Sequence, residues 1–286
     1  MKNILVTGGQ GQLATCIKDS TKGSNDLNFT YVDINELDIT NQNAVNRFFN
    51  ENKFKYCINC AAYTAVDNAE SNQELAKQVN EIGAKNLAYA CKNHNTVLIH
   101  ISTDFVFDGK QTNFYTEEDS TNPLSVYGAT KRNGELAIVN SIKEHFIIRT
   151  SWLYSEHGHN FLKTMFRLGS ERQNLSVVVD QIGTPTYAGD LAKVILSIIQ
   201  EDSSLFGIYH YSNEGVSSWY DFAVAIFDIS NLDVQVDPIK TTAYPTPAIR
   251  PKNSIMDKSK IKETFNLQIP YWRESLQKMM TKMKYK

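Results

Sequence analysis

Tyr127 and Lys131 are the two side chains of this 286-residue chain whose types and spacing suit proton transfer. They stand four residues apart in Tyr-Gly-Ala-Thr-Lys, and helical residues at that spacing lie on one face, one turn above the other. The phenol and the ammonium can therefore point into one pocket. Because a nearby cation stabilises phenolate, we expect Lys131 to lower the pKa of Tyr127 from about 10 towards the working range of a proton donor.

A strand that ends in hydroxyl side chains completes this group. Residues 97–102 are typical of a buried strand, and Ser102 and Thr103 stand at its end. A hydroxyl there can hold a carbonyl oxygen while Tyr127 delivers a proton to it, and Lys131 can anchor a nicotinamide ribose. With a hydride donor beside it, this group would make a carbonyl reductase. We interpret His100, in the same strand, as a packed residue rather than a ligand.

The amino-terminal segment has the pattern of a dinucleotide site. An apolar strand over residues 1–7 leads directly into Gly-Gly-Gln-Gly-Gln-Leu-Ala at 8–14. Glycine lets the backbone approach a pyrophosphate, whose charge suits the amides at a helix start. The common fingerprint has another spacing, although alanine is an accepted third residue. The alternative is a tight turn before an ordinary helix; the position directly after an apolar strand favours the nucleotide.

Asp33 ends the second expected strand, residues 29–33. An acidic residue there would bond a ribose 2'-hydroxyl and repel a 2'-phosphate. No Arg or Lys follows it immediately, which slightly favours NADH over NADPH. Two alternatives stay open: Asp33 is a turn residue, and Asp38 with Ile39 contacts the adenine or ribose end.

The elements that position these residues alternate between strand and helix. Helices are expected at 41–52 and 72–93, and strands at 56–60, 97–102 and 146–150. This alternation predicts an α/β, Rossmann-type, doubly wound parallel sheet with helices on both faces. Ligands of such sheets bind outside the carboxyl ends of the strands, so we expect four segments to converge there. They are residues 8–14, 61–67, 102–104 and 150–152.

From about residue 151 the pattern changes, because prolines, aromatics and turn residues increase. We expect a dinucleotide-binding domain over 1–150 plus about 187–208, and a smaller substrate lobe over 151–186 and 209–286. A helix at 188–200 returns the chain to the first domain.

Charge and cysteine usage exclude several classes of protein. A net charge of −2 gives no basic footprint for nucleic acid. With no long apolar run and no cleavable signal, we expect a cytoplasmic enzyme with no membrane contact.

Cys57-x-x-Cys60 suggests a redox or zinc site, but strand residues three apart face opposite sides of the sheet, which predicts buried structural thiols. His157-Gly-His159 resembles a metal-binding pair, but we expect it to lie in a solvated loop with no cluster of carboxylates or cysteines around it, and hence no metal ligands.

Segments along almost the whole chain resemble the extended short-chain dehydrogenase/reductase family, and within it the dTDP-4-dehydrorhamnose reductases. The segments that carry this resemblance are residues 36–40, 61–70, 102–109, 123–128, 149–154, 180–186 and 250–251. The resemblance implies that Thr103, Tyr127 and Lys131 form the catalytic group. It also implies that Asp104 and Trp152 contact the sugar, with Thr64 and Val66 nearby.

The resemblance and the arguments above together predict a dinucleotide site. Its members are Gly8, Gly11, Gln12, Leu13, Asp33, Asp38, Ile39, Ala61, Ala62, Tyr63, Thr64, Ser102, Tyr127 and Lys131. From the residues alone, Trp152 is equally a core aromatic. Arg250 lies in a proline-rich segment that is either a rigid surface loop or a source of guanidinium for a diphosphate.

By this resemblance, the chain uses NAD(P)H to reduce the 4-keto group of dTDP-4-dehydro-L-rhamnose to dTDP-L-rhamnose, for cell-surface polysaccharide. Two alternatives stay open: a related 4-keto-6-deoxy sugar, or a non-catalytic regulatory subunit like that of methionine adenosyltransferase, against which the intact catalytic group argues. Some members dimerise through magnesium bound to acidic residues, one of them early in the first helix. Cys16 stands at that position, so we expect a monomer or a metal-independent homodimer.

Overall fold

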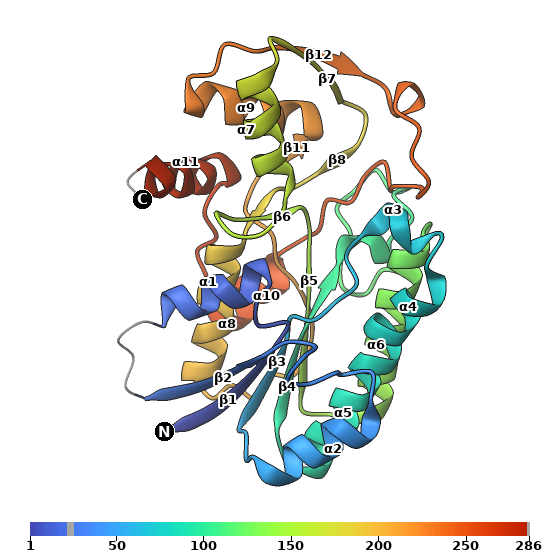
Figure 1. Cartoon of the computed structure of the whole chain (residues 1–286), viewed down its shortest axis with the longest axis vertical. Helices are drawn as coiled ribbons and strands as arrows, with labels where there is room; N and C mark the ends of the chain where they lie inside the picture. The colour runs from blue at the N-terminus through green and yellow to red at the C-terminus, as the bar shows by residue number, and fades with distance from the viewer. Residues whose placement is uncertain (22–25, 285–286) are drawn as a thin grey trace.

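The computed structural model describes residues 1–21 and 26–284, built around one six-stranded sheet (Figure 1). All of its strands are parallel, in the order β10-β5-β4-β3-β1-β2. Their bounds are β1 Lys2–Thr7, β2 Leu27–Val32, β3 Tyr56–Asn59, β4 Val97–Thr103, β5 His145–Thr150 and β10 Gly207–His210. This confirms the predicted doubly wound α/β fold.

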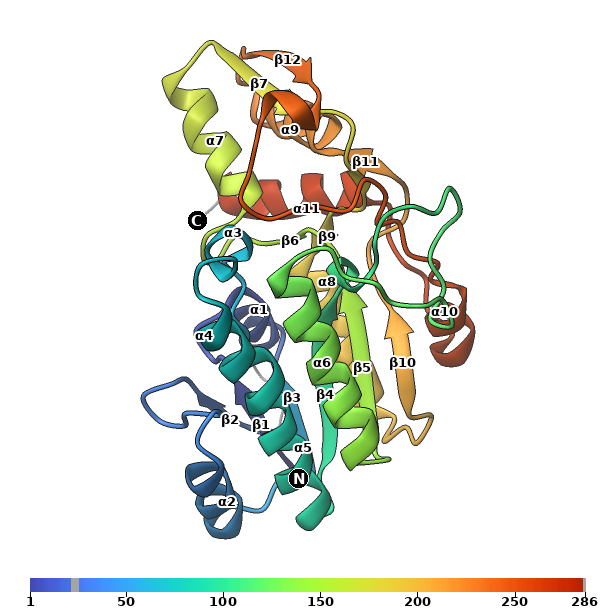
Figure 2. The same ribbon diagram turned by 90° about the vertical axis from the view of Figure 1, so that its right-hand side faces the viewer.

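Helices cover both faces of the sheet (Figure 2). One face packs against α1 Gln12–Ser20, α8 Ala188–Gln200 and α10 Ser259–Phe265. The other packs against α2 Gln42–Glu51, α5 Ala84–Asn93 and α6 Val126–Ser141. Because successive strand residues alternate in direction, Ile4 and Val6 enter the first core and Leu5 the second.

The same alternation separates the cysteines of Cys57-x-x-Cys60. Cys57 is buried in the core beneath α5, whereas Cys60 packs against the opposite core. All four cysteines are free thiols. The predicted placement of Cys57 and Cys60 on opposite faces is therefore confirmed, with Cys57 buried as expected and Cys60 only partly buried.

The strand order reverses between β1 and β3, and two backbone segments meet closely there. Gly8 adopts φ 64°, and a Cβ at this position would lie 2.8 Å from Cα of Ala61. Only glycine fits this position without strain. The predicted glycine-rich turn thus lies at the switch point, where such sheets bind ligands.

The expected continuous helix at 72–93 is interrupted. The chain forms α4 Gln73–Lys77, then a π-helix Gln78–Gly83, then α5. The wider turn brings Asn80 inward, where it is buried and bonds Tyr63 and Thr130. The apolar periodicity of the sequence does not show this insertion. π-Helical turns of this kind are frequent at functional sites.

A second group of elements, which we call the second lobe, lies above the carboxyl ends of the strands (Figure 1). Its core joins helices α7, α9 and α11 to the two-stranded sheet of β7 and β12. Its elements are β6 Leu153–Tyr154, α7 Phe161–Glu171, β7 Asn174–Val178, β8 Ile182–Gly183, β9 Thr186–Tyr187, β11 Ser217–Ser218, α9 Trp219–Ser230, β12 Gln235–Ile239 and α11 Trp272–Lys284. The shorter helices are α3 Val66–Ala69, η2 Asp104–Val106 and η3 Thr241–Ala243.

Two segments predicted for the substrate lobe pack with the main sheet. Residues 209–210 belong to β10, which pairs with β5. Ile261 and Phe265 of α10 enter the core beneath that sheet. The division into two domains stays a prediction, with these segments as structural reasons to extend the first. No helix in the described ranges is long and apolar enough to span a bilayer.

Candidate active site

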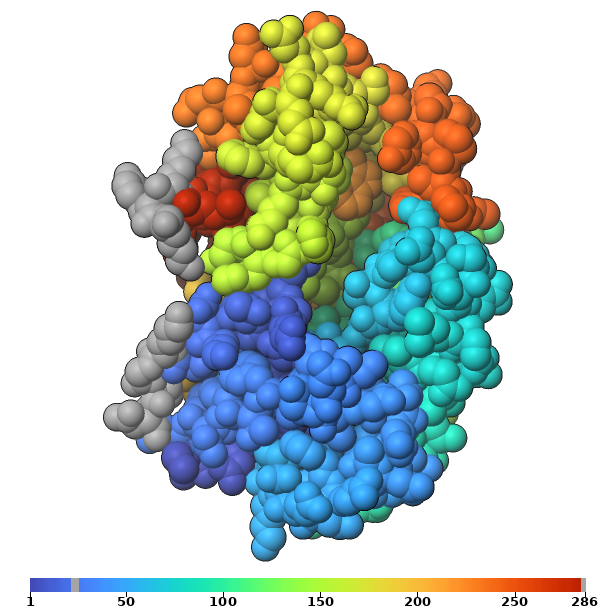
Figure 3. Space-filling view, in the orientation of Figure 1, coloured from blue at the N-terminus to red at the C-terminus, as the bar shows by residue number. Residues whose placement is uncertain are grey.

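Every residue predicted for the catalytic group, the dinucleotide or the sugar lines one cleft of about 1190 Å³. The cleft lies at the carboxyl ends of β1, β3, β4 and β5, below the second lobe. Figure 3 shows this face hollowed between the blue, cyan and yellow-green segments. The functional role of each residue stays a prediction, but their convergence is a property of the fold.

The start of α1 fits an anionic group. Gly11 caps the helix without a side-chain hydrogen bond, so the first amides of α1 are not satisfied by a cap. Gln12 reaches across the cleft instead, and its Oε1 accepts bonds from Asn160 Nδ2 at 2.8 Å and Ser155 Oγ at 3.1 Å. Leu13 is buried in the core beneath the sheet.

Asp33 supports the glycine-rich turn directly. Its carboxylate accepts from the backbone amides of Gln10 at 3.1 Å and Ile34 at 2.9 Å. Both the turn interpretation and a contact with ribose are compatible with this geometry. Asp38 accepts from the amide and the hydroxyl of Thr40, and Ile39 is buried beside the cleft.

The loop after β3 is held in place by hydrogen bonds to Asn80 of the π-helix, which in turn bonds α6. The amide of Tyr63 donates to Oδ1 of Asn80 at 2.8 Å, and Nδ2 of Asn80 donates to Oγ1 of Thr130 on α6. This links the loop of Ala61, Ala62 and Thr64 to the helix that carries Tyr127. Val66 begins α3 at the rim of the cleft.

Tyr127 and Thr103 meet at the centre of the cleft. Ser125 caps α6 by accepting from the amide of Gly128, which places Tyr127 in the first turn of the helix. The Tyr127 ring packs edge-on against Phe105, with ring centroids 5.6 Å apart. Its hydroxyl lies close enough to that of Thr103 for Thr103 to lower the pKa of Tyr127. These two oxygens can therefore act on one carbonyl group.

The predicted lowering of the Tyr127 pKa is wrong for this structure. Removal from water raises the pKa of Tyr127 to about 12, against a smaller lowering by Thr103. The ammonium of Lys131 does not face the phenol: its Nζ donates to the carbonyl of Ile101 at 2.6 Å. Tyr127 is therefore a protonated phenol at neutral pH, which is the form a proton donor requires.

Lys131 instead ends a buried hydrogen-bond chain that the sequence does not reveal. The amide of Ala61 donates to Oδ1 of Asn59, which directs Nδ2 of Asn59 to Nδ1 of His100 at 2.9 Å. His100 then carries its proton on Nε2, which lies 3.2 Å from Nζ of Lys131. A proton directed at Nζ favours the neutral amine. Burial lowers the pKa of Lys131 to about 8, against smaller raising effects of Glu135 and Cys60.

Asp104 offers an unused acceptor to the cleft. It is 1% exposed, and its Oδ1 accepts from the hydroxyl of Thr103 at 3.0 Å. Its Oδ2 is buried without a hydrogen-bond partner among the described residues. Burial raises the pKa of this carboxyl to about 6. Ser102, at the end of β4, also has a buried hydroxyl without a partner there.

Two tryptophans form the wall on the lobe side. Trp152 has a φ of 47°, which is unusual for a bulky residue, and its indole stacks on Trp219 at 3.6 Å with 7° between the planes. Gly183 makes room for it, since a Cβ there would lie 2.6 Å from the indole. Trp152 is therefore a cleft residue rather than a core aromatic. Trp219 was missed, although Ser218 and Asp221 form a capping box that marks it as the first residue of α9.

Arg250 is already paired. Its two terminal nitrogens bind the two carboxylate oxygens of Asp67, at 3.0 and 2.7 Å. This pair ties the proline-rich segment to α3 at the rim of the cleft, and Arg250 lowers the pKa of Asp67. Contact with a diphosphate stays a prediction, and it requires the guanidinium to share or exchange this partner.

The expectation of a solvated His157-Gly-His159 loop is wrong for its first histidine. Nε2 of His157 lies 2.9 Å from Oδ2 of Asp19 on α1, and Cys16 and Glu156 lie beside it. The sequence separates His157 from Asp19 by 138 residues, so no local pattern shows this contact. Residues 158–160 border the cleft.

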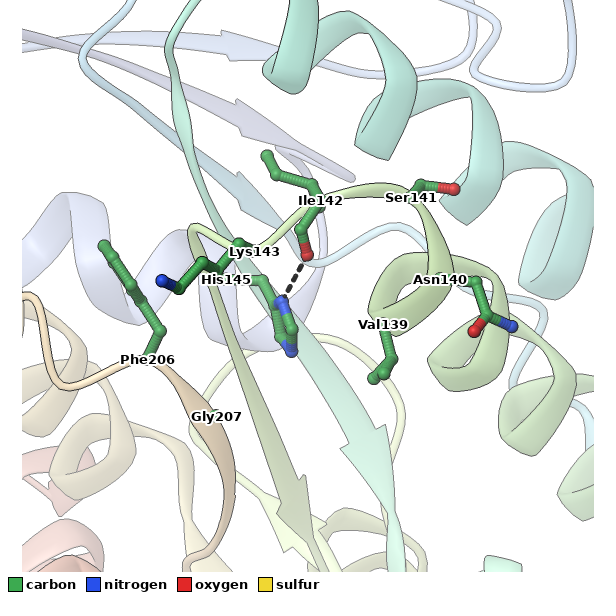
Figure 4. A pocket seen from close by; sticks show the side chains of 8 residues that line it. All are labelled: Val139, Asn140, Ser141, Ile142, Lys143, His145, Phe206 and Gly207. Atoms are coloured by element: carbon green, nitrogen blue, oxygen red, sulfur yellow. Dashed lines mark hydrogen bonds between the residues drawn. The ribbon is translucent and has the colours of Figure 1, made fainter.

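A second hollow of about 400 Å³ lies at the other end of the sheet (Figure 4). It is formed where α6 ends and β5 begins, and Nδ1 of His145 contacts the carbonyl of Ile142 at 2.7 Å. Since ligands of parallel sheets bind at the opposite end, this hollow is not a candidate active site.

Known proteins agree with this fold and this site. Residues 1–285 match the family described as RmlD substrate binding domain. The dTDP-4-dehydrorhamnose reductase of Aggregatibacter actinomycetemcomitans is 41% identical over 96% of this chain and 97% of its own. The crystal structure of a dTDP-4-dehydrorhamnose reductase from Clostridium acetobutylicum superposes with a TM-score of 0.95, 44% identity and 99% of both chains covered. The crystal structure of the Bacillus anthracis dTDP-4-dehydrorhamnose reductase, in complex with NADP, also superposes with a TM-score of 0.95. It is 40% identical and covers 98% of this chain and 99% of its own. The chain described here belongs to the dTDP-4-dehydrorhamnose reductase family of oxidoreductases.

Proposed function

We propose that this chain reduces the 4-keto group of dTDP-4-dehydro-L-rhamnose to dTDP-L-rhamnose with NADH or NADPH, in the cytoplasm. The observation that carries the proposal is the meeting of Thr103 and Tyr127 with a glycine-rich helix start in one cleft. Family membership supports the substrate, and four free cysteines support a reducing compartment.

The cleft fits a dinucleotide on structural grounds. The backbone at Gly8 leaves no room for a side chain, a Cβ at Gly11 would lie 3.1 Å from the carbonyl oxygen of Gly8, and the first amides of α1 have no side-chain cap. We assign the diphosphate to Gly11, Gln12 and Leu13, the adenosine end to Asp33, Asp38 and Ile39, and the nicotinamide end to Ser102 and Lys131. The loop of Ala61, Ala62, Tyr63 and Thr64 lies between them. When bound, NAD(P)H supplies the hydride that reduces C4.

The protein's own part in the reaction is to hold and protonate the carbonyl oxygen. In the substrate complex the hydroxyl of Thr103 exchanges Oδ1 of Asp104 for this oxygen as its acceptor, and Oη of Tyr127 gives the oxygen a proton. The raised pKa of Tyr127 keeps that proton available at neutral pH. In its charged form Lys131 binds the nicotinamide ribose.

The remaining residues orient the sugar nucleotide. The open Oδ2 of Asp104 accepts a sugar hydroxyl, and the Trp152 indole covers the apolar face of the deoxysugar. Thr64 and Val66 line the near rim, and Arg250 faces the diphosphate. These assignments are proposals that the cleft geometry supports.

Product identification tests the function. Purified protein is mixed with dTDP-4-dehydro-L-rhamnose and each cofactor, and the product is identified by NMR. We expect cofactor oxidation and dTDP-L-rhamnose. Formation of a different dTDP-deoxysugar would show the wrong sugar assignment. Tight dinucleotide binding without turnover on any keto sugar would favour a regulatory subunit.

Asp33 predicts a preference for NADH. Two like charges about 4 Å apart in water repel by about 1 kcal/mol, so we expect kcat/KM for NADH to exceed that for NADPH about fivefold. Asp33→Asn should remove most of this difference. A wild-type preference for NADPH would show that Asp33 serves only the turn that it already bonds.

Cys16 predicts that magnesium is not needed for assembly of this chain. Magnesium prefers carboxylate oxygen and binds thiols poorly. We expect light scattering to give the same mass in excess magnesium and in EDTA, for a monomer or for a dimer held by ordinary packing. Dissociation with loss of activity in EDTA alone would contradict this prediction.

A further inference from the structure

Three side chains outside the proposed catalytic group form what we call the Cys16 cluster: Cys16, Glu156 and His157. Cys16 lies on α1, and the other two on the loop that follows β6, directly above it (Figure 1). Their thiol, carboxylate and imidazole atoms all lie within 4.8 Å of one another. A thiol, a carboxylate and an imidazole are the side-chain ligands that zinc takes in proteins.

The carboxylate of Glu156 has room to bind a further partner. Oε2 of Glu156 is buried and has no hydrogen-bond partner among the described residues. Its Oε1 accepts only from the hydroxyl of Tyr187, at 3.3 Å. A carboxylate oxygen desolvated without a partner costs free energy, which a divalent cation would recover.

We propose that the Cys16 cluster binds one zinc ion through Sγ of Cys16, a carboxylate oxygen of Glu156 and an imidazole nitrogen of His157. In this step Zn²⁺ forms a bond to sulfur, and the thiol proton is released to solvent. Zinc bonds of about 2.0 to 2.3 Å need ligand atoms within about 4 Å of one another, so the cluster closes by about 1 Å or less. A water molecule takes the fourth position on the partly exposed side of His157.

Asp19 acts outside the zinc ligands in this arrangement. Its Oδ2 lies 2.9 Å from Nε2 of His157, so the imidazole donates to a carboxylate from one nitrogen and ligates through the other. This is the usual way in which proteins orient a zinc-binding histidine.

The ion would join two parts of the molecule that flank the cleft. Ser155 and Asn160, on the same loop as Glu156 and His157, both hold the Gln12 side chain at the start of α1. Zinc between this loop and α1 would be a second link between the two, beside the hydrogen bonds of Gln12 to Ser155 and Asn160. The proposed site is therefore structural, and the reductase reaction does not run through it.

Metal titration of the untagged, chelator-treated chain tests the proposal. Zinc is titrated against a chromophoric chelator, and cobalt is added separately to detect thiolate-to-cobalt charge transfer. We expect one zinc per chain and a cobalt–thiolate band that Cys16→Ser removes. His157→Gln should weaken zinc binding by more than about 100-fold, because losing even an outer partner of a ligand costs about 10- to 100-fold.

Matched controls separate the cluster from the other thiols and histidines. Cys91→Ser removes a buried thiol elsewhere in the core, and His94→Gln removes a histidine at the end of α5. Both should bind zinc as the wild type does. Absence of a stoichiometric zinc, or equal zinc binding by His157→Gln and the wild type, would overturn the proposal. If Cys16→Ser does not fold by circular dichroism, His157→Gln on its surface loop decides.

Discussion

Tyr127→Phe lowers kcat by about 100- to 10,000-fold while dinucleotide affinity stays close to that of the wild type. The expected size is that of a lost general acid. The phenyl ring keeps its packing against Phe105 and the helix keeps its Ser125 cap, so only the hydroxyl group with its proton is removed. Steady-state rates with the keto sugar and fluorescence titration with NADH measure the two quantities.

A tyrosine away from the cleft provides the control. Tyr89 lies on α5 and is 38% exposed, so Tyr89→Phe removes a hydroxyl with no expected change in rate. If Tyr127→Phe kept a kcat near that of the wild type, another group would be the proton donor. Asp104, whose pKa is raised to about 6, would then be the first candidate.

Lys131→Met weakens both turnover and dinucleotide binding. A hydrogen bond from a charged group contributes about 1.5 to 3 kcal/mol, so losing the ribose contact should raise the dinucleotide Kd by about 10- to 150-fold. Methionine is unbranched and fills the 1%-exposed site of Lys131 without leaving a large void. Isothermal titration with the dinucleotide, beside kcat, checks both effects.

The pH profile separates the charge of Lys131 from its packing. A lysine is charged below its pKa, and that of Lys131 is lowered to about 8. We therefore expect wild-type kcat/KM to fall as pH rises through about 8, and the same fall to be absent in Lys131→Met. Lys85→Met, on the exposed side of α5, should behave as the wild type. An unchanged dinucleotide affinity in Lys131→Met would remove the ribose-anchoring role.

The sequence predicted the cleft well because its members follow simple rules. Glycines after an apolar strand, hydroxyls at a strand end and a helical i, i+4 pair all fall at the carboxyl ends of parallel strands. A doubly wound sheet brings those ends together whatever the details of packing. Gly8, Thr103, Tyr127 and Trp152 consequently line one cleft.

The parts that were missed depend on contacts between distant segments. The partner of Lys131 is His100, whose proton position is set by Asn59 and Ala61 through burial and not through sequence pattern. The π-helical turn at Asn80 leaves the apolar periodicity of its helix almost unchanged. The meeting of His157 with α1 likewise requires the folded lobe.

The main sheet and its core are completed by segments from late in the sequence, and this order affects folding during synthesis. Until β10 at Gly207–His210 has emerged from the ribosome, β5 is an open edge of the sheet. The core beneath that sheet is complete only with Ile261 and Phe265 of α10, near the carboxyl terminus. Contacts of such large sequence separation form slowly, and unpaired strand edges invite aggregation. The sheet is therefore expected to finish folding only after residues 261–265 have emerged, and a fragment ending near residue 150 should need chaperone protection.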